Sequence, residues 1–467
     1  MPSANPLESM RSPQSTFCLK RLRSSALGGL GSAVSRLLRL ALFAWLALAG
    51  RGAWSATVAD PDRASPAMVV QSLAEGQPSY QKFEGRLSEL EIRLFADAAD
   101  GHWDSHTLLT AALVASGVDN QAALRRYERR FGELVAELRR SGRVSGSPRQ
   151  RAEAIFDFMH QRVLGGGYHL DCTDLAVLLE QGRFNCASAS VLFSCLAGEF
   201  GLTVRGIEIP GHALIKLVLP EGCLDIETTC PDCFRLLENS RKQTGLPPGT
   251  LAGEKRARAP QTSREVSDVQ LVAMIYYNRG VDLLAQNRFR EALAANAKAL
   301  RLDPQSATAR GNLLATINNW AVAEARLRHY LKAVELLRRG LAMEPGYETL
   351  RVNLSRVYEQ WADDLCGAER FAEALAVLAE AARDRPGEPG FVLARLKVYR
   401  RWARWCREKG HWEERSAVLS QARRDFGDAM PPSELDDSEL AQAGKSGPST
   451  SPNAGTSIPE TSPIATQ

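Results

Sequence analysis

Hydrophobic residues recur at three- and four-residue spacing between residues 71 and 143. The recurring apolar positions are Leu87, Leu90, Ile92, Leu94, Leu108, Leu109, Leu113, Leu124, Tyr127, Phe131, Leu134 and Leu138. This spacing places apolar side chains on one face of a helix, so we predict a helical lead-in over 70–145. After the break at Ser147 and Pro148, a further helix is expected over 150–163.

The pattern changes from helical spacing to alternation after residue 200, and this change predicts strands. Residues 202–209, 212–219 and 223–229 are three such runs, separated by the turn pairs Pro210-Gly211 and Glu221-Gly222. Upstream, a short helix over 175–181 should end at Gly182, and an apolar helix should follow from 186 to 200. The segment therefore combines helices with an antiparallel sheet, which is an α+β pattern.

One cysteine stands where such a helix would stabilise a thiolate. Asn185 is a candidate N-cap, so Cys186 would occupy the first helical turn, next to unpaired backbone N–H groups and the positive end of the helix dipole. A free cysteine is by default a small buried hydrophobe, which is our interpretation of Cys195 on the same helix. The residues that follow Cys186 point to a different role for it.

A histidine and two acids could complete the machinery of a thiol nucleophile. His212 begins a predicted strand, and an acid on the neighbouring strand could hold its imidazole in the correct tautomer. Asp225 and Glu227 differ by two positions and so share one face of the sheet. A two-residue turn brings Glu227 closer to His212, so we predict Glu227 as the third member of the triad, with Asp225 in reserve.

These residues resemble the core of the transglutaminase-like branch of the papain-like cysteine enzymes. The resemblance covers about 150–235, within a transglutaminase-like domain expected over 146–240. It is carried by Asn185-Cys186-x-Ser188, by Pro210-Gly211-His212 and by Glu227-Thr228-Thr229. In that family the Cys heads the central helix, the His heads a strand, and an Asp in an Asp-x-Thr element follows on the next strand. The resemblance implies a papain/transglutaminase-like fold and a Cys186–His212 pair as catalytic residues.

The chain departs from the family at two positions. Glu227 stands where the family has Asp, and Ala213 follows His212 where the family commonly has Trp. The resemblance implies attack of Cys186 on an amide carbonyl through a thioester, with the backbone N–H of Cys186 as one oxyanion donor and Gln181 or Asn185 as a candidate second donor. Whether water or an amine releases the acyl group stays open, which leaves a cysteine peptidase or amidase and a transglutaminase-like acyltransferase as alternatives. No cofactor and no metal are expected, and no acidic loop of the calcium-binding kind is present.

An internal repeat of 41 residues dominates 266–427. The recurring small and proline positions are Gly280, Ala292, Ala299 and Pro304, then Ala321, Ala333, Gly340 and Pro345, then Ala362, Ala374, Ala381 and Pro386. Trp320, Trp361 and Trp402 recur in the same register. The spacing within each unit resembles tetratricopeptide (TPR) repeats, whose unit of 34 residues is seven shorter, so we place the excess in the first helix of each later pair. The resemblance implies an all-α TPR solenoid whose groove binds a protein or peptide.

Three segments outside the predicted domains are expected to be a leader, a linker and a tail. Basic residues precede an apolar run at 40–49 that is shorter than the ~20 residues of a membrane span, so 1–55 is expected to be a signal peptide cut after Ser55 or an uncleaved signal anchor. Either alternative exports the protein to the periplasm or the extracellular space, with membrane contact only through an uncleaved N-terminus. Residues 241–265 are expected to be a linker and 428–467 a disordered tail.

The net charge and the cysteine content limit which kinds of function the sequence supports. A net charge of +4 over 467 residues gives no electrostatic case for nucleic-acid binding. Cys230 and Cys233 form a lone C-x-x-C, for which export favours a structural disulfide over a zinc site. Two functions remain: an exported thiol enzyme whose repeats bind a protein partner or substrate, and a catalytically inactive transglutaminase-like/TPR scaffold for protein–protein interaction.

Overall fold

The computed structural model describes residues 79–232, 234 and 263–427. Within these residues the protein is of mixed α+β class with a helical majority, and this part of the prediction is confirmed. The predicted leader over 1–55, the tail over 428–467 and most of the predicted linker lie outside the described residues. All described residues belong to one compact unit, 76–467.

The first part of this unit is a set of helices, most of which have a side-chain cap at the N-terminus. They are α3 (Glu89–Asp97), α4 (Leu108–Ala115), α5 (Gln121–Arg140), α6 (Pro148–Phe158) and α7 (Leu175–Gln181). The side chains of Ser88, Thr107, Asn120 and Ser147 each accept a backbone N–H of the first helical turn, a contact that typically contributes about 1 kcal/mol. The predicted lead-in is therefore three separate α-helices with short connections.

A four-stranded antiparallel sheet follows, in the order β5-β4-β3-β6. Its strands are β3 (Val204–Ile209), β4 (His212–Leu219), β5 (Gly222–Ile226) and β6 (Arg264–Val266). Ile209 pairs with His212 across Pro210 and Gly211, and Gly211 has φ 80°, a conformation that glycine adopts without strain. Leu219 pairs with Gly222, so the second turn consists of residues 220 and 221, one position earlier than predicted.

Strand β6 joins this sheet from across the predicted linker. Its residues pair with β3, with Val266 opposite Gly206, a pairing that the sequence analysis did not predict. The end of the segment assigned to the linker is thus part of the sheet.

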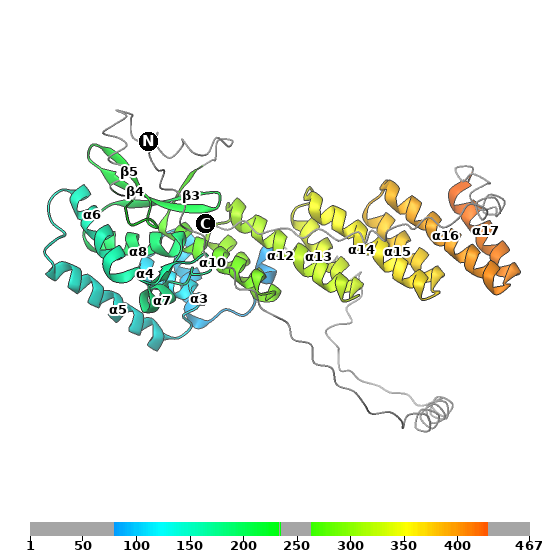
Figure 1. The fold of residues 1–467 in the computed structure, drawn as a ribbon, viewed down its shortest axis with the longest axis horizontal. Coiled ribbons are helices and arrows are strands. Elements are labelled where there is room, and N and C mark those ends of the chain that lie inside the picture. Colours follow the sequence, from blue (N-terminus) through cyan, green and yellow to red (C-terminus); the bar gives the residue numbers. More distant parts are fainter. Residues whose placement is uncertain (1–78, 233, 235–262, 428–467) are drawn as a thin grey trace, which may run out of the picture. The chain divides into compact units, whose positions relative to one another are not determined.

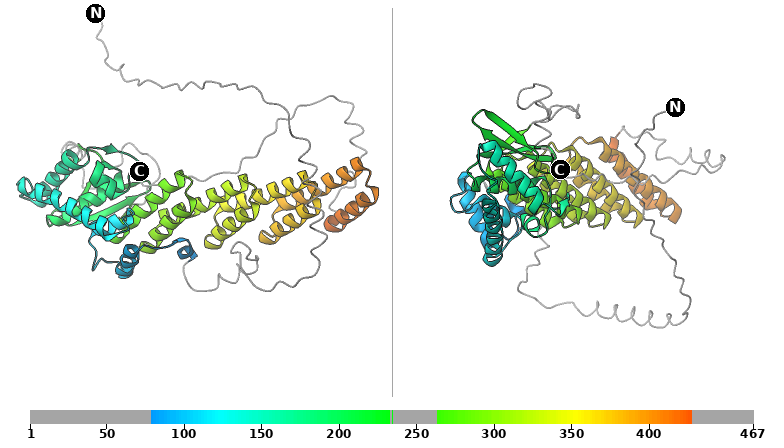
Figure 2. Two further views of the ribbon diagram at one scale, coloured as in Figure 1. Left: turned by 90° about the horizontal axis from the view of Figure 1, so that it is seen from below. Right: turned by 60° about the vertical axis from the view of Figure 1, so that its left-hand side comes forward.

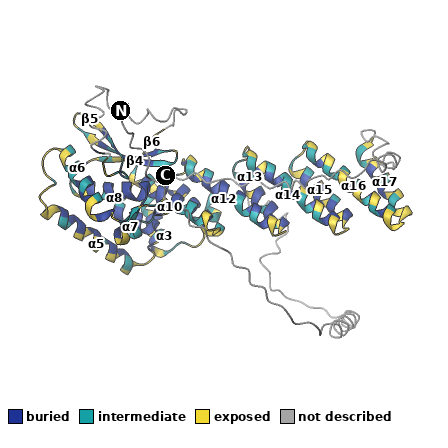
Figure 3. Ribbon diagram, viewed as in Figure 1, coloured by how far each residue is buried: buried dark blue, intermediate teal, exposed yellow. Residues whose placement is uncertain are grey.

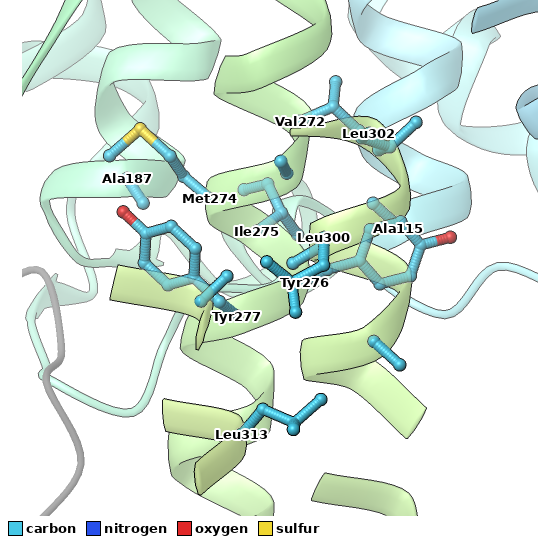
Figure 4. Close-up of a cluster of buried hydrophobic side chains, with 14 of the residues drawn as sticks. Ala115, Ala187, Val272, Met274, Ile275, Tyr276, Tyr277, Leu300, Leu302 and Leu313 are labelled. Carbon is cyan, nitrogen blue, oxygen red and sulfur yellow. The ribbon is translucent and has the colours of Figure 1, made fainter. Parts of the chain in front are cut away.

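Helices α8 (Cys186–Glu199) and α10 (Asp268–Ala285) lie side by side in the core, as Figure 1 shows. Helix α8 packs on β3 and β4, and α10 packs on both α4 and α8. Both helices are buried over most of their length (Figure 3). The close-up in Figure 4 shows Met274 and Tyr277 of α10 in the same apolar cluster as Ala187, the residue after Cys186.

Beyond α10 the chain continues as helices that pair in chain order, and α10 itself is the first helix of the first pair (Figure 2). They are α11 (Phe289–Leu302), α12 (Ala307–Arg326), α13 (Tyr330–Met343), α14 (Glu348–Gly367), α15 (Phe371–Asp384), α16 (Pro389–Lys409) and α17 (Trp412–Phe426). Helices α12, α14 and α16 have 20, 20 and 21 residues, whereas α13 and α15 have 14 each. The extra residues lie in the first helix of each later pair, as predicted.

The 41-residue period recurs in the backbone and in the aromatic contacts. Asn287, Arg328, Glu369 and Gly410 all have positive φ and lie two positions before the first residue of the second helix of a pair. Trp320, Trp361 and Trp402 stack on Phe289, Tyr330 and Phe371 with ring centroids 6.1, 5.9 and 5.8 Å apart. The small residues permit close helix contact, since a Cβ at Gly340 would lie 2.6 Å from Cδ1 of Leu350.

A buried carboxylate links the sheet to the repeats. Glu208 on β3 is only 7% exposed, and its Oε1 accepts hydrogen bonds from the hydroxyls of Tyr277 (3.0 Å) and Thr308 (2.9 Å). Its Oε2 accepts from Arg264 of β6, which also donates to Asp303 at 2.6 Å. The sheet and the first helix pair therefore share polar as well as apolar contacts. None of the helices in the described part of the chain is long and apolar enough to cross a membrane.

Candidate active site

The N-terminus of α8 presents Cys186. Asn185 is the N-cap, and its Oδ1 accepts the N–H groups of Ala187 (3.0 Å) and Ser188 (3.1 Å), while the N–H of Asn185 donates to Oγ of Ser188 at 3.0 Å. This capping box confirms the predicted helix start and makes Cys186 the first helical residue. The cap does not use the N–H of Cys186, which remains the natural donor at the mouth of the helix.

Both hydrogens of the Asn185 side-chain amide are used in hydrogen bonds that hold the fold together. Its Nδ2 donates to the carbonyl of Leu170 at 3.1 Å and to Oγ1 of Thr173 at 2.7 Å, which fixes the preceding loop to the start of α8. Gln181 is exposed at the end of α7. Of the two side chains considered as a second oxyanion donor, Asn185 therefore has both amide hydrogens engaged elsewhere.

His212 is the first residue of β4, and its ring faces both Cys186 and Glu227. Nε2 lies 2.5 Å from Oε2 of Glu227, and the ring also hydrogen-bonds with the side chain of Cys186. Burial alone would lower the pKa of His212, but the hydrogen bonds with Cys186 and Glu227 raise it to about 10. With Nε2 occupied by Glu227, Nδ1 is the ring nitrogen left for the sulfur.

Glu227 lies one residue beyond β5 and is held by its own chain. Its Oε1 accepts from the N–H of Thr229 at 3.0 Å and from the hydroxyl of Thr229 at 2.6 Å. Burial would raise the pKa of Glu227, but the hydrogen bonds from His212 and Thr229 lower it, so the carboxylate is charged beside the imidazolium. Asp225, the reserve candidate, pairs across the sheet with Lys216 and does not contact His212.

The three side chains differ in accessibility. The side chains of His212 and Glu227 are 27% and 22% exposed, whereas Cys186 is 0% exposed. Solvent therefore reaches the site from the side of the imidazole and the carboxylate. The sulfur itself is covered in this conformation.

Tyr168 is a further residue of the site that the sequence analysis did not identify. It belongs to β1 (Gly167–Tyr168), which pairs in parallel with β2 (Arg183–Phe184), and its ring meets Phe184 edge-on with centroids 5.9 Å apart. Burial, followed by the negative charges of Cys186 and Glu227, raises the pKa of Tyr168 to about 12. A two-residue strand has no periodic pattern, so the sequence carried no signal for it.

The remaining described cysteines are either free thiols or disulfide-bonded. Cys172, Cys195, Cys223, Cys366 and Cys406 are free thiols, and burial raises the pKa of Cys195. Cys230 is disulfide-bonded, in line with the preference for a bridge over zinc, and Cys233 lies outside the described residues. Across 79–232 and 263–427, no group of three or more His, Cys, Asp or Glu side chains is arranged to hold a metal ion.

Comparison with protein-family models, curated proteins and solved structures finds no match to this chain. What this chain does is therefore inferred from the geometry of Cys186, His212 and Glu227 and from the sequence resemblance.

Proposed function

We propose that the chain is an exported transglutaminase-like cysteine enzyme that acts on amide or peptide bonds through a thioester, with TPR repeats that bind a protein partner or substrate. One observation supports it most: the His212 ring lies between the Cys186 side chain and the Glu227 carboxylate, with Nε2 2.5 Å from Oε2. A cysteine at a helix N-terminus, an imidazole and an orienting acid are the parts of an activated thiol nucleophile.

The first half of the proposed reaction forms a thioester. His212 takes the proton of the Cys186 thiol, and the sulfur attacks the carbonyl carbon of the substrate amide. The backbone N–H of Cys186 donates to the oxyanion that develops. As the C–N bond breaks, Nδ1 of His212 gives its proton to the leaving amine, and the acyl group stays on the sulfur.

The second half releases the acyl group. His212, now neutral, takes a proton from a water molecule or from an amine, whose lone pair attacks the thioester carbonyl. The sulfur departs as a thiolate and the imidazolium is restored. Hydrolysis by water makes the enzyme a peptidase or amidase, and transfer to an amine makes it a transglutaminase-like acyltransferase.

The papain-like core and the TPR solenoid are parts of this proposal. For the core, support comes from α8 packing on β3 and β4, with Cys186 at the head of the helix and His212 at the head of a strand. For the solenoid, support comes from the helix pairs at 41-residue steps and from their repeated Trp stacking. Export to an oxidising compartment accords with the disulfide of Cys230.

One observation favours the alternative, an inactive scaffold for protein–protein interaction. Cys186 is 0% exposed, as a structural core cysteine would be. In that alternative the same fold would serve only to carry the repeats.

Turnover on a peptide library separates the two functions. The full chain is incubated with a proteome-derived peptide mixture, with and without an added primary amine, and mass spectrometry records cleaved, deamidated and amine-coupled products. We expect one product class to require Cys186 and to vanish in Cys186→Ala. The control is Cys195→Ala, which changes another thiol of α8. If no product depends on Cys186, the proposed enzyme function is wrong and the inactive scaffold is the better description of the chain.

A further inference from the structure

The turn after α6 places a second histidine next to the site. Residues Met159–Val163 form a π-helical turn that follows α6 directly, and His160 lies in it. Such turns shift side chains out of the helical register and are frequent at functional sites. The proposed mechanism does not use His160.

The ring of His160 contacts the segment that leads into Cys186. Its centroid lies 4.6 Å from that of Phe156, on α6, and 6.3 Å from that of Phe184, which it meets edge-on at 80°. Phe184 is the last residue of β2, two positions before Cys186. His160 therefore packs between α6 and the segment that leads into Cys186.

The same ring holds the segment that carries Glu227. His160 hydrogen-bonds with the backbone of Thr228, the residue after Glu227. Its Nε2 is buried and has no hydrogen-bond partner among the described residues, so Nδ1 is the nitrogen that donates to Thr228. Burial lowers the pKa of His160, which keeps the ring neutral with a single N–H.

Thr228 is held from a second side as well. It is 0% exposed, and its Oγ1 lies 3.1 Å from Oγ of Ser190, one helical turn beyond Cys186 on α8. Thr228 is thus fixed between the π-helical turn and the nucleophile helix. Its neighbours in the chain, Glu227 and Thr229, make the contacts that orient the carboxylate.

Stability alone gives no reason for a histidine here. A buried nitrogen without a partner costs about 1–3 kcal/mol, which offsets the roughly 0.5–1.5 kcal/mol that the hydrogen bond to Thr228 contributes. The polar function that His160 supplies is its single hydrogen bond to Thr228.

We propose that His160 is a positioning residue, which holds Thr228 and thereby keeps the Glu227 carboxylate against the His212 ring. The inference rests on the proposed function, because it concerns the same triad. In this role His160 makes no contact with the substrate.

Two substitutions separate this role from packing. His160→Asn places an amide N–H near the position of Nδ1, and His160→Phe keeps a ring but removes the donor. The readout is the titration midpoint of His212, followed by NMR of the full chain with labelled histidine and assigned with His212→Gln. This readout needs no turnover, so it stays informative if the proposed enzyme activity is absent.

We expect His160→Phe to lower the His212 midpoint by about one pH unit, the equivalent of one hydrogen bond, and His160→Asn to leave the midpoint near wild type. The rate of Cys186 alkylation by iodoacetamide at neutral pH should change in the Phe variant alone. His160→Phe removes both the hydrogen bond to Thr228 and the partnerless Nε2, so its unfolding temperature should stay near that of wild type. An unchanged midpoint in His160→Phe, an equal shift in both variants, or a Phe variant that fails to fold would each overturn the proposal.

Discussion

The contact between Glu227 and His212 can be tested by removing one charge. Glu227→Gln keeps the size of the side chain and leaves Oε1 available to Thr229, but it removes the negative charge whose Oε2 lies 2.5 Å from Nε2. The pKa of His212, raised to about 10 in the intact site, should therefore fall. An opposite charge at this range shifts a pKa by about 1–3 units, which corresponds to roughly 1.4–4 kcal/mol in favour of the imidazolium.

The sign of the effect on stability follows from the direction of the shift. The pKa of His212 is raised in the folded protein from 6.5 to about 10, so its contribution is full below about pH 6.5 and is lost as the pH rises through about 10. The pKa of Glu227 is lowered from 4.5, so its contribution is present above about pH 4.5 and is lost as the pH falls through its lower folded value. As the pH rises from the lowered His212 midpoint of Glu227→Gln to about 10, wild type should therefore lose its stability advantage over the variant.

The measurement is an NMR titration of His212 together with urea unfolding at several pH values. The matched control is Asp225→Asn, since Asp225 lies opposite Lys216 and makes no contact with His212. We expect a lower His212 midpoint in Glu227→Gln and an unchanged one in Asp225→Asn. Equal midpoints in wild type and Glu227→Gln would refute the electrostatic reasoning, and a shift in Asp225→Asn would make Asp225 the effective acid.

Further predictions concern the packing that supports the site. Glu208→Ala should lower the free energy of unfolding by about 3–5 kcal/mol in a urea titration, because it leaves Arg264 without one buried partner. The control, Glu265→Gln, breaks an exposed ion pair and should lower the free energy of unfolding by under about 1 kcal/mol in the same titration. Met274→Ala should cost about 2–5 kcal/mol by opening a cavity beside Ala187, measured by thermal unfolding. A chain that ends at residue 262 should fail to give a cooperative unfolding transition, because it lacks β6 and α10.

Local sequence signals were sufficient for the elements that carry the candidate site. Gly182 ends α7 through its left-handed backbone conformation, and Asn185 starts α8 through capping; both effects depend only on nearby residues. The Pro210-Gly211 turn likewise sets the register that places His212 at the start of β4. The contact between His212 and Glu227 followed from counting residues along a hairpin.

Contacts between distant segments were not predictable in the same way. Tyr168, His160 and Thr228 come together only in the folded chain, through a two-residue strand, a π-helical turn and a buried pair of hydroxyls. Strand β6 has three residues and follows a long polar stretch, so nothing local indicates its partner.

Helix α10 is a different case, because its sequence did carry a signal. The repeat register assigned it to the solenoid, but the run from Val269 to Tyr277 is apolar on all sides of the helix, which is typical of a helix buried in a core. The structure buries these residues against α4 and α8.

The reactivity of the Cys186 thiol tests the central claim most directly. The native full chain and its His212→Ala variant are treated briefly with iodoacetamide from about pH 6 upward, and mass spectrometry follows each free cysteine. The account predicts that Cys186 in wild type reacts at about pH 6 faster than Cys172 or Cys366, and that this advantage disappears in His212→Ala. A Cys186 that stays unmodified in the native protein, and reacts only after unfolding, would contradict it.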